Sequence, residues 1–170
     1  QTLLFQYPPA IAGSLSPYFS ASVKLEMGAL SDHYPVENAA VTPYLSDAIS
    51  DALPESTTHL RVLEAKRTFW EKATILHRLH HLPEGARIAP RMSRHYYDVF
   101  RLSQSPVWSY VLDSLDLLDR VVVQTRVFFK RAWAKYDEAR TGKLRLSPSV
   151  RIKGPLEQDY RDMRPMFFSE

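Results

Sequence analysis

Hydrophobic and polar side chains alternate at every second position in the first part of the chain, which predicts β-strands. The clearest case is residues 19–26, where each apolar side chain is followed by a polar one. An apolar run over 2–7 ends at two prolines, which cannot continue a strand ladder, and residues 59–63 form a third candidate strand. A short apolar segment over 43–53 predicts one helix between these strands.

Beyond residue 65 the spacing of hydrophobic side chains changes to three and four residues, which predicts helices. Phe69, Ala73 and Leu76 fall on one stripe of the first of them. Thr68, with Glu71 three residues later, has the form of a capping box. We therefore expect this helix to begin at Thr68.

Three further helical segments are predicted after the first helix. One begins near Ser93, and a longer one covers about 107–140 with an interruption near 116–119. Pro155 is expected to open the last helix, because proline is well tolerated in a first helical turn.

The predicted elements divide the chain into a β-rich segment over 1–64 and a mainly helical region over 65–170, so the fold class is α+β. The chain starts with Gln1 and enters a strand directly. Because an isolated pair of strands is only marginally stable, we expect residues upstream of Gln1 to complete the sheet.

The composition excludes several classes of protein. None of the 170 residues is cysteine, which excludes a disulfide scaffold, a thiolate metal site and a cysteine nucleophile, and which suits a reducing cytoplasm. The five glycines are not clustered, so the chain has neither a Walker loop nor a dinucleotide-binding fingerprint. No apolar run reaches the ~18 residues that span a bilayer, and we expect no membrane partner.

Positive charge is concentrated in the middle of the chain. Residues 1–64 carry two basic and seven acidic side chains, whereas residues 65–101 carry eight basic and three acidic ones and four of the six histidines. A basic surface of this kind attracts phosphate groups or acidic partners. A solvated helix surface would have the same composition, so the charge alone leaves both interpretations open.

Lys72 lies inside the apolar stripe of the first predicted helix, about 60° around the helix axis from Phe69. A helix built only for packing would carry an apolar residue there, because burying an unpaired ammonium group is costly. Lys72 is therefore a candidate for binding phosphate oxygens in a cleft. The structural alternative is a lysine stem that covers the edge of the stripe.

Two carboxylates are further candidates for chemistry. Asp98 shares a predicted helix face with Arg94 and Arg101, either as part of a solvated ion-pair cluster or as a carboxylate oriented by two guanidinium groups. Glu26 lies on the polar face of a strand beside Lys24, either as a ligand of Mg²⁺ or as the ion-pair partner of that lysine.

Three histidines suggest a metal site as a separate alternative. His77 and His80 lie three residues apart on the first predicted helix, and His95 lies on the second. A zinc site or a two-metal hydrolase site needs ligands that converge from at least two helices. The chain has neither an HExxH pair nor a His-Asp dipeptide, which favours the basic helix surface as the place of these histidines.

The segments RTFWEKATILHR (67–78) and RMSRHYYD (91–98) resemble the abortive-infection nucleotidyltransferase toxin family of the AbiEii/AbiGii type. The segment VKLEMG (23–28) and the pattern Asp159-Tyr160-x-x-Met163 resemble the same family, so the similarity covers nearly the whole chain in order. The resemblance implies part of a polymerase-β-like nucleotidyltransferase sheet, followed by a mainly helical C-terminal region.

The resemblance also implies roles for individual residues. Lys72 and Asp98 match the family's helix lysine and the aspartate of its next helix, and are the expected catalytic residues. Glu26 matches a strand carboxylate near the catalytic metal, which implies Mg²⁺ as cofactor. The expected nucleotide-binding or acceptor-binding residues are Arg78, Arg94 and Tyr97.

A family member transfers a nucleotide from an NTP to an acceptor, for which RNA such as tRNA is a candidate, and is a cytoplasmic bacterial toxin paired with a cognate antitoxin. This chain lacks the family's Gly-Ser element followed by a strand with two carboxylates, which would hold Mg²⁺. We therefore expect the C-terminal portion of such a toxin, inactive by itself. The alternative is a non-catalytic helical module that binds a protein through an amphipathic helix over about 115–140.

Overall fold

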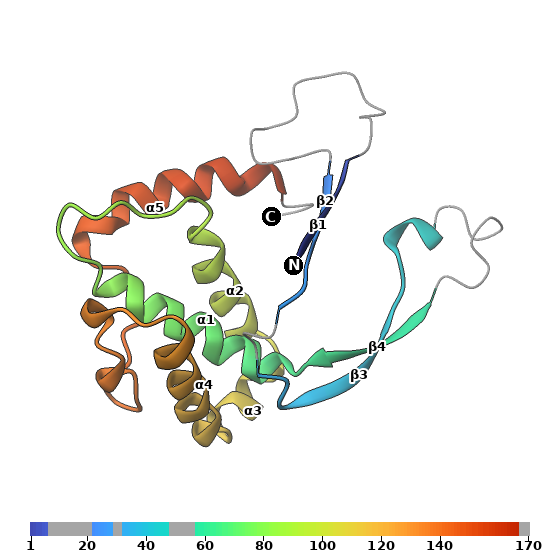
Figure 1. The fold of residues 1–170 in the computed structure, drawn as a ribbon, viewed down its shortest axis with the longest axis horizontal. Helices are drawn as coiled ribbons and strands as arrows, with labels where there is room; N and C mark the ends of the chain where they lie inside the picture. Colours follow the sequence, from blue (N-terminus) through green and yellow to red (C-terminus); the bar gives the residue numbers. More distant parts are fainter. Residues whose placement is uncertain (7–21, 29–31, 48–56, 167–170) are drawn as a thin grey trace.

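The computed structural model describes residues 1–6, 22–28, 32–47 and 57–166, and packed helices form its centre (Figure 1). The first helix, α1, packs against α2, α3 and α4, and α5 lies against α2. The helices are α1 (Ala65–His80), α2 (Ser93–Ser103), α3 (Val107–Leu112), α4 (Leu115–Phe128) and α5 (Val150–Met163). Short 3₁₀ turns are η1 (Tyr44–Asp47), η3 (Ala132–Ala134), η4 (Tyr136–Glu138) and η5 (Arg164–Met166).

The described strands form two separate antiparallel sheets of two strands each. β1 (Thr2–Gln6) pairs with β2 (Ser22–Glu26), and β3 (Val36–Val41) pairs with β4 (Thr58–Leu63), which leads into α1. In Figure 1 both hairpins lie beside the helices rather than among them. The α+β class is confirmed, and the polymerase-β-like sheet stays a prediction, as does the division at residue 64.

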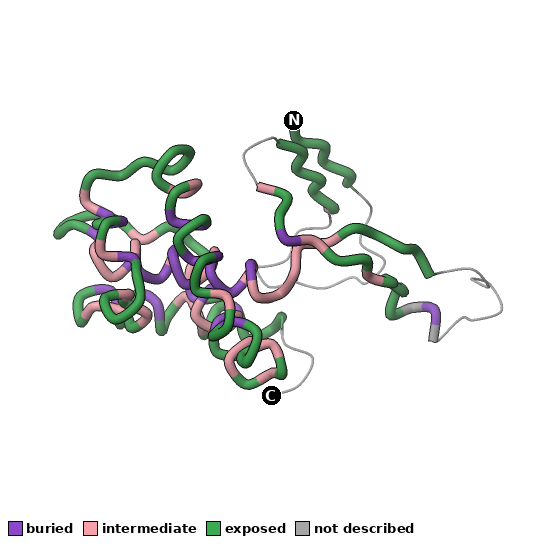
Figure 2. Tube along the Cα trace, turned by 90° about the horizontal axis from the view of Figure 1, so that it is seen from below, coloured by how far each residue is buried: buried purple, intermediate pink, exposed green. Residues whose placement is uncertain are grey.

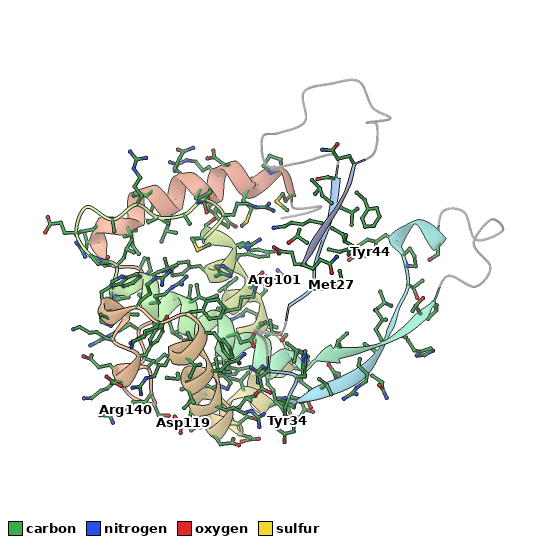
Figure 3. All side chains as sticks on the ribbon, in the orientation of Figure 1. Met27, Tyr34, Tyr44, Arg101, Asp119 and Arg140 are labelled. Atoms are coloured by element: carbon green, nitrogen blue, oxygen red, sulfur yellow. The ribbon has the colours of Figure 1, made fainter. Side chains whose placement is uncertain are left out.

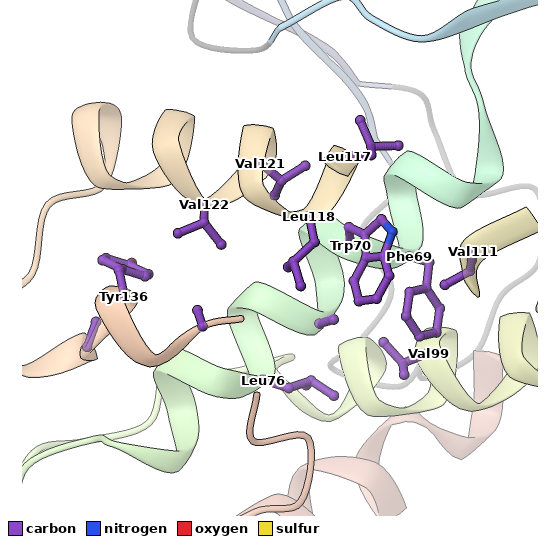
Figure 4. Packing of buried hydrophobic residues seen from close by; sticks show 13 residues of the cluster. Phe69, Trp70, Leu76, Val99, Val111, Leu117, Leu118, Val121, Val122 and Tyr136 are labelled. Atoms are coloured by element: carbon purple, nitrogen blue, oxygen red, sulfur yellow. The ribbon is translucent and has the colours of Figure 1, made fainter. Parts of the chain in front are cut away.

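The hydrophobic core is built by the helices around α1. Phe69, Trp70 and Leu76 of α1 are buried together with Val111 of α3 and Leu118 of α4 (Figure 4). Buried residues gather in the helices, whereas the hairpins are mostly exposed (Figure 2). The apolar stripe predicted on α1 is therefore the centre of the core. None of the described helices is long and apolar enough to cross a bilayer.

The strand predictions are confirmed where the structure describes them. β1 covers residues 2–6 of the predicted run, residues 59–63 fall within β4, and β2 covers the last five residues of 19–26. Residues 19–21 lie outside the described residues. The helix predicted over 43–53 is a 3₁₀ turn, η1, in the part of that segment that is described.

The capping box predicted at Thr68 is wrong, because α1 begins three residues earlier. The Thr68 N–H donates to the Glu64 carbonyl at 3.2 Å, as in the interior of a helix. Glu71 accepts a hydrogen bond from the Arg67 side chain at 2.9 Å instead of reaching back to the Thr68 amide. Contacts of buried Arg67 with distant segments hold this first turn, and a local capping pattern carries no information about them.

The long helix predicted over 107–140 is two helices followed by 3₁₀ turns. The break lies before α4 rather than at 116–119, and Asp116 sits in the first turn of α4, where a carboxylate is favoured by the helix dipole. The helix ends at Phe128, because the chain then folds back and buries Tyr136 in the core. The single long helix of the interaction-module alternative is therefore absent from the described residues.

The last helix also begins before its predicted start. Pro155 lies inside α5, which starts at Val150. In the turn before the proline, Ile152 is buried and Arg151 donates to the Leu82 carbonyl at 2.7 Å. Proline disfavours a helical turn before it, because it has no N–H and its ring crowds that turn. These tertiary contacts hold residues 150–154 in helical conformation despite Pro155.

Candidate active site

Lys72 of α1 and Asp98 of α2 form an ion pair where the two helices meet. Lys72 Nζ lies 2.7 Å from Asp98 Oδ2, and the two side chains are 25% and 34% exposed. The neighbouring Phe69 and Leu76 on α1, and Val99 on α2, are buried in the core. Packing on both sides therefore fixes the ion pair, while its atoms remain accessible to a solute.

Asp98 pairs across the helix interface rather than with the arginines of its own helix. The ion pairs of the described residues include none between Asp98 and either Arg94 or Arg101. Both arginines are exposed on α2. The cluster predicted around Asp98 thus consists of one ion pair to Lys72, with two exposed guanidinium groups beside it.

His95 is buried on α2, close to the same charges. Burial lowers the pKa of His95 to about 4, with further lowering by the positive charges of Lys72, Arg94 and Arg78, while Asp98 acts in the opposite direction. The imidazole is therefore neutral at neutral pH. The charged groups that act on His95 are three cations and the Asp98 carboxylate, an excess of positive charge that favours an anionic ligand.

Tyr97 lines a groove of about 470 Å³ between α2 and α5. Arg101 lies in the last turn of α2, where Figure 3 labels it. Its guanidinium carbon is 6.0 Å from the centre of the Tyr97 ring. Tyr97 directly precedes Asp98 in the sequence, so the groove and the ion pair occupy neighbouring faces of one helix.

Arg78 and Glu26 line a different cavity, of about 450 Å³, between α1, α4 and the end of β2. The α1 wall of this cavity includes Glu71. Successive side chains on a helix differ in direction by about 100°, so Lys72 points away from this cavity. The structure therefore does not bring Glu26 to the Lys72–Asp98 pair.

Glu26, the expected Mg²⁺ ligand, forms an ion pair with Lys24 at 2.6 Å and its side chain is 67% exposed. A hydrogen bond from Lys24, together with the lysine's charge, lowers the pKa of the Glu26 carboxyl group. No three His, Asp or Glu side chains among the described residues are placed to hold a metal ion. Mg²⁺ requires several hard oxygen ligands, so these residues by themselves do not fit it.

The histidine metal site is not supported, because His77 has a structural role. The Arg145 N–H donates to His77 Nδ1 at 3.1 Å, which leaves Nε2 as the donor to the Lys135 carbonyl at 3.0 Å. His77 is fully buried, and burial lowers its pKa. His80 pairs through Nδ1 with the Ser147 carbonyl at 2.9 Å. The first of the three proposed ligands therefore has no free nitrogen for a metal.

Arg67 is a buried charged residue that the sequence analysis missed. Its guanidinium group donates to Glu71 at 2.9 Å, Asp32 at 3.1 Å, the Tyr34 carbonyl and Gln124. Since the side chain is fully buried, these bonds compensate its desolvation and tie α1 to α4 and to the segment before β3. The spacing of Arg67 and Glu71, four residues apart on one helix, was the available signal.

Arg120 of α4 strengthens the same junction. Its guanidinium group donates to both carboxylate oxygens of Asp32 and lies 4.7 Å from the centre of the Tyr34 ring. The hydrogen bond from Arg120, helped by the charges of both arginines against the opposing effect of burial, lowers the pKa of Asp32 to about 2. This junction positions the hairpin β3–β4 at the start of α1.

Asp159, which the sequence analysis noted only as part of a family pattern, holds the start of α2. Its carboxylate on α5 accepts hydrogen bonds from the Arg91 N–H at 2.6 Å, the Ser93 N–H at 2.8 Å and the Ser93 hydroxyl at 2.6 Å. A negative charge at this place also complements the helix dipole. Asp159 therefore fixes the helix that carries Asp98.

One family model matches the chain over residues 1–170, and its description is "Nucleotidyl transferase AbiEii toxin, Type IV TA system". The match includes both hairpins as well as the helices that carry Lys72 and Asp98. No curated protein and no solved structure matches the chain.

Proposed function

The chain belongs to the AbiEii family of nucleotidyl transferase toxins of type IV toxin–antitoxin systems, and from that premise we propose its part in the reaction. The toxin transfers a nucleotide from an NTP to an acceptor. The acceptor is RNA such as tRNA, because the basic residues over 65–101 attract its phosphates. Lys72 and Asp98 lie in its catalytic site. A cognate antitoxin is its protein partner, and the bacterial cytoplasm, which holds NTPs and RNA, is its place of action.

The observation that carries this proposal is the Lys72–Asp98 ion pair at 2.7 Å, at a half-exposed position between packed helices. In the transfer, an acceptor hydroxyl loses its proton to water while its oxygen bonds to the α-phosphorus. The bond from this phosphorus to the bridging oxygen breaks, and pyrophosphate leaves with that electron pair. Lys72 has three N–H donors, so it holds phosphate oxygens while Asp98 keeps the ammonium group in place. Its charge opposes the negative charge that builds up on the phosphates.

The surrounding residues complete the proposed binding surface. Arg94 is exposed beside the ion pair and contacts the nucleotide or the acceptor, as does Tyr97 in the neighbouring groove. Arg78 lines the other cavity with Glu26, so in this proposal it adds positive charge only at longer range. Neutral His95 then donates or accepts a hydrogen bond without adding charge.

We further propose that the 170 residues alone do not transfer nucleotides. The sequence has no Gly-Ser element followed by a strand with two carboxylates, and the described residues form no metal site. The divalent metal used by nucleotidyltransferases therefore needs ligands in addition to Glu26. This chain supplies the lysine, the aspartate that holds it and the helices that position both.

Labelled nucleotide transfer tests the proposal. The reading frame that contains this chain, extended upstream of Gln1, is incubated with labelled NTPs, Mg²⁺ and total RNA, beside its Lys72→Ala variant and beside the 170-residue chain. We expect label in RNA with the extended protein, a loss of at least a hundredfold with Lys72→Ala, and none with the 170-residue chain, since positioned charges contribute on that scale.

Lys66→Ala is the matched control. Lys66 lies on the same helix, pairs with Glu64 at 2.8 Å, and is 28% exposed, close to the value for Lys72. If Lys66→Ala and Lys72→Ala reduce transfer equally while both variants stay folded, the proposed role of Lys72 is wrong.

A non-catalytic interaction module remains the second candidate, and exposed apolar side chains on α4 favour it. Val123 and Val127 are 61% and 68% exposed, and Phe128 is 48% exposed. Such a module would bind its protein partner equally well with Lys72→Ala and would lose affinity with Val127→Ser. Absence of transfer from any NTP to RNA, protein or a small molecule, together with this pattern, would support the module.

A further inference from the structure

Aromatic side chains form part of the walls of the groove between α2 and α5. Tyr97 and Phe100 line it from α2, and Tyr160 lines it from α5. Phe100 is 60% exposed, although the hydrophobic core lies on another face of the same helix. Phe100 therefore presents aromatic surface to solvent on a face of α2 that the hydrophobic core does not use.

Cationic side chains border this aromatic surface on both helices. Lys153 and Arg161 line the α5 side, and Arg94 and Arg101 are exposed along α2. The acidic residue in the lining, Glu157, lies 3.9 Å from Lys153 and offsets one of these charges. The groove thus combines aromatic rings with an excess of positive charge, which complements a chain of phosphates with bases attached.

We infer that this groove binds single-stranded nucleic acid, with bases stacked on the aromatic side chains and phosphates next to the arginines. Stacking on rings requires unpaired bases, so a duplex does not fit this arrangement. Tyr97 and Asp98 are consecutive on α2, so a strand in the groove leads toward the Lys72–Asp98 pair. Only the identification of this strand as the acceptor rests on the proposed function.

Direct binding measurements test the inference without any nucleotide transfer. Fluorescein-labelled oligonucleotides of about ten nucleotides, as single-stranded RNA, single-stranded DNA and duplex, are titrated with the 170-residue chain and followed by anisotropy. We expect the single strands to bind and the duplex to bind at least tenfold more weakly. Tighter binding of RNA than of DNA identifies ribose contacts, and equal binding identifies stacking and phosphate contacts alone; both support the groove.

Substitutions of Phe100 separate base stacking from simple apolar contact. Phe100→Leu keeps an apolar side chain and removes the ring, and should lower affinity for the single strands roughly tenfold. Phe100→Trp keeps a ring and should bind at least as tightly as the wild type. Phe128→Leu, at a 48% exposed phenylalanine on α4, is the matched control and should have no effect.

The salt dependence provides a second readout. Each phosphate contact removed lowers the slope of log affinity against log salt by about 0.7 for a single strand. Arg161→Gln should lower the slope by this amount, whereas Phe100→Leu should lower affinity and leave the slope unchanged. Arg140→Gln, at an exposed arginine that precedes α5 and is labelled in Figure 3, should leave both unchanged.

Three results would overturn the inference: equal affinity for duplex and single strand, wild-type binding by Phe100→Leu, or an apolar peptide that saturates the groove while no oligonucleotide binds. Circular dichroism checks that each variant is folded. Groove binding without nucleotide transfer by the extended protein would contradict only the proposed function. Transfer to RNA with wild-type binding by Phe100→Leu would contradict only the groove.

Discussion

The buried imidazole of His95 makes the stability of the fold depend on pH. Burial, with the charges of Lys72 and Arg94, lowers the pKa of His95 to about 4, whereas an unfolded histidine titrates near 6.5. Between these values the unfolded chain binds a proton that the folded chain does not. The free energy of unfolding should therefore be fully retained above pH 6.5 and fall as the pH decreases toward 4.

Urea unfolding at pH 7.5, 6 and 5 measures this dependence. Burial also lowers the pKa of His77 and His81, so His95→Gln should reduce the slope between pH 6.5 and 4 without abolishing it. His59→Gln, at an exposed position on β4, should leave the slope unchanged. A wild-type slope in His95→Gln would show that the imidazole is protonated or exposed in the folded state.

At the residue scale, a mismatch between a side chain and its predicted surroundings indicates which residue has a role beyond packing. Lys72 stood out because an ammonium group fell within an apolar stripe, and the structure places it in an ion pair. Its partner Asp98 was singled out separately, but with the wrong neighbours, because helical spacing relates only residues of one helix. Arg67 was missed because its partners Asp32 and Gln124 lie 35 and 57 residues away.

At the scale of elements, the contact between α5 and the start of α2 determines where Asp98 lies. Asp159→Ala should destabilise the chain by about 1–2 kcal/mol, because the Arg91 and Ser93 amides lose their acceptor. Hydrogen exchange should show faster exchange of the Ser93 amide, and urea unfolding should give the free energy. Asp162→Ala, on the same helix and bonded to Gln158 at 2.8 Å on the exposed face, is the control.

If Asp159→Ala and Asp162→Ala change stability equally, the capping contact contributes nothing beyond helix propensity. A larger loss with Asp159→Ala should be accompanied by weaker protection throughout α2, since the contact lies at its first turn. The buried Met163 and Leu156 would then still hold α5 on the body, so the helix should remain folded.

Helix and strand types were predictable from hydrophobic spacing, but the ends of helices were not. The start of α1, the end of α4 at Phe128 and the position of Pro155 inside α5 all differ from the prediction. In each case a contact between distant segments overrides a local signal: Arg67 at the start of α1, buried Tyr136 after α4, and Ile152 in α5. Such contacts join residues far apart in the chain, so the spacing of hydrophobic side chains within one segment does not predict them.

At the scale of the whole molecule, the candidate site was predictable only in part. The lysine and the aspartate were identified before their contact was known, whereas the association of Glu26 with them was an expectation from family resemblance. The structure places Glu26 in another cavity and pairs it with Lys24. A sequence indicates which residue types can carry chemistry. Whether a strand residue such as Glu26 comes close to a helix residue such as Lys72 depends on how the strand packs against the helix, which the sequence pattern alone does not give.

The apolar side chains of the hairpin β1–β2 are not covered by the other residues that the structure describes, so this hairpin should unfold independently of the helices. Leu3 pairs with Leu25 and Phe5 with Val23, and all four side chains are 40% or more exposed. Two strands without a packed face contribute little to global stability. Helical residues such as Leu118, which is 1% exposed, should carry that stability instead.

The double variant Val23→Thr/Leu25→Thr should therefore change the free energy of unfolding of the helical body by no more than about 0.5 kcal/mol. Leu118→Ala should lower it by roughly 2–5 kcal/mol, because it leaves a cavity in the core. Helical circular dichroism during urea unfolding measures both, and hydrogen exchange should find the amides of β1–β2 exchanging through local opening, far faster than those of α1. A large loss of helical stability in the double variant would contradict this prediction, because it would mean that the apolar side chains of this hairpin are buried against the helices.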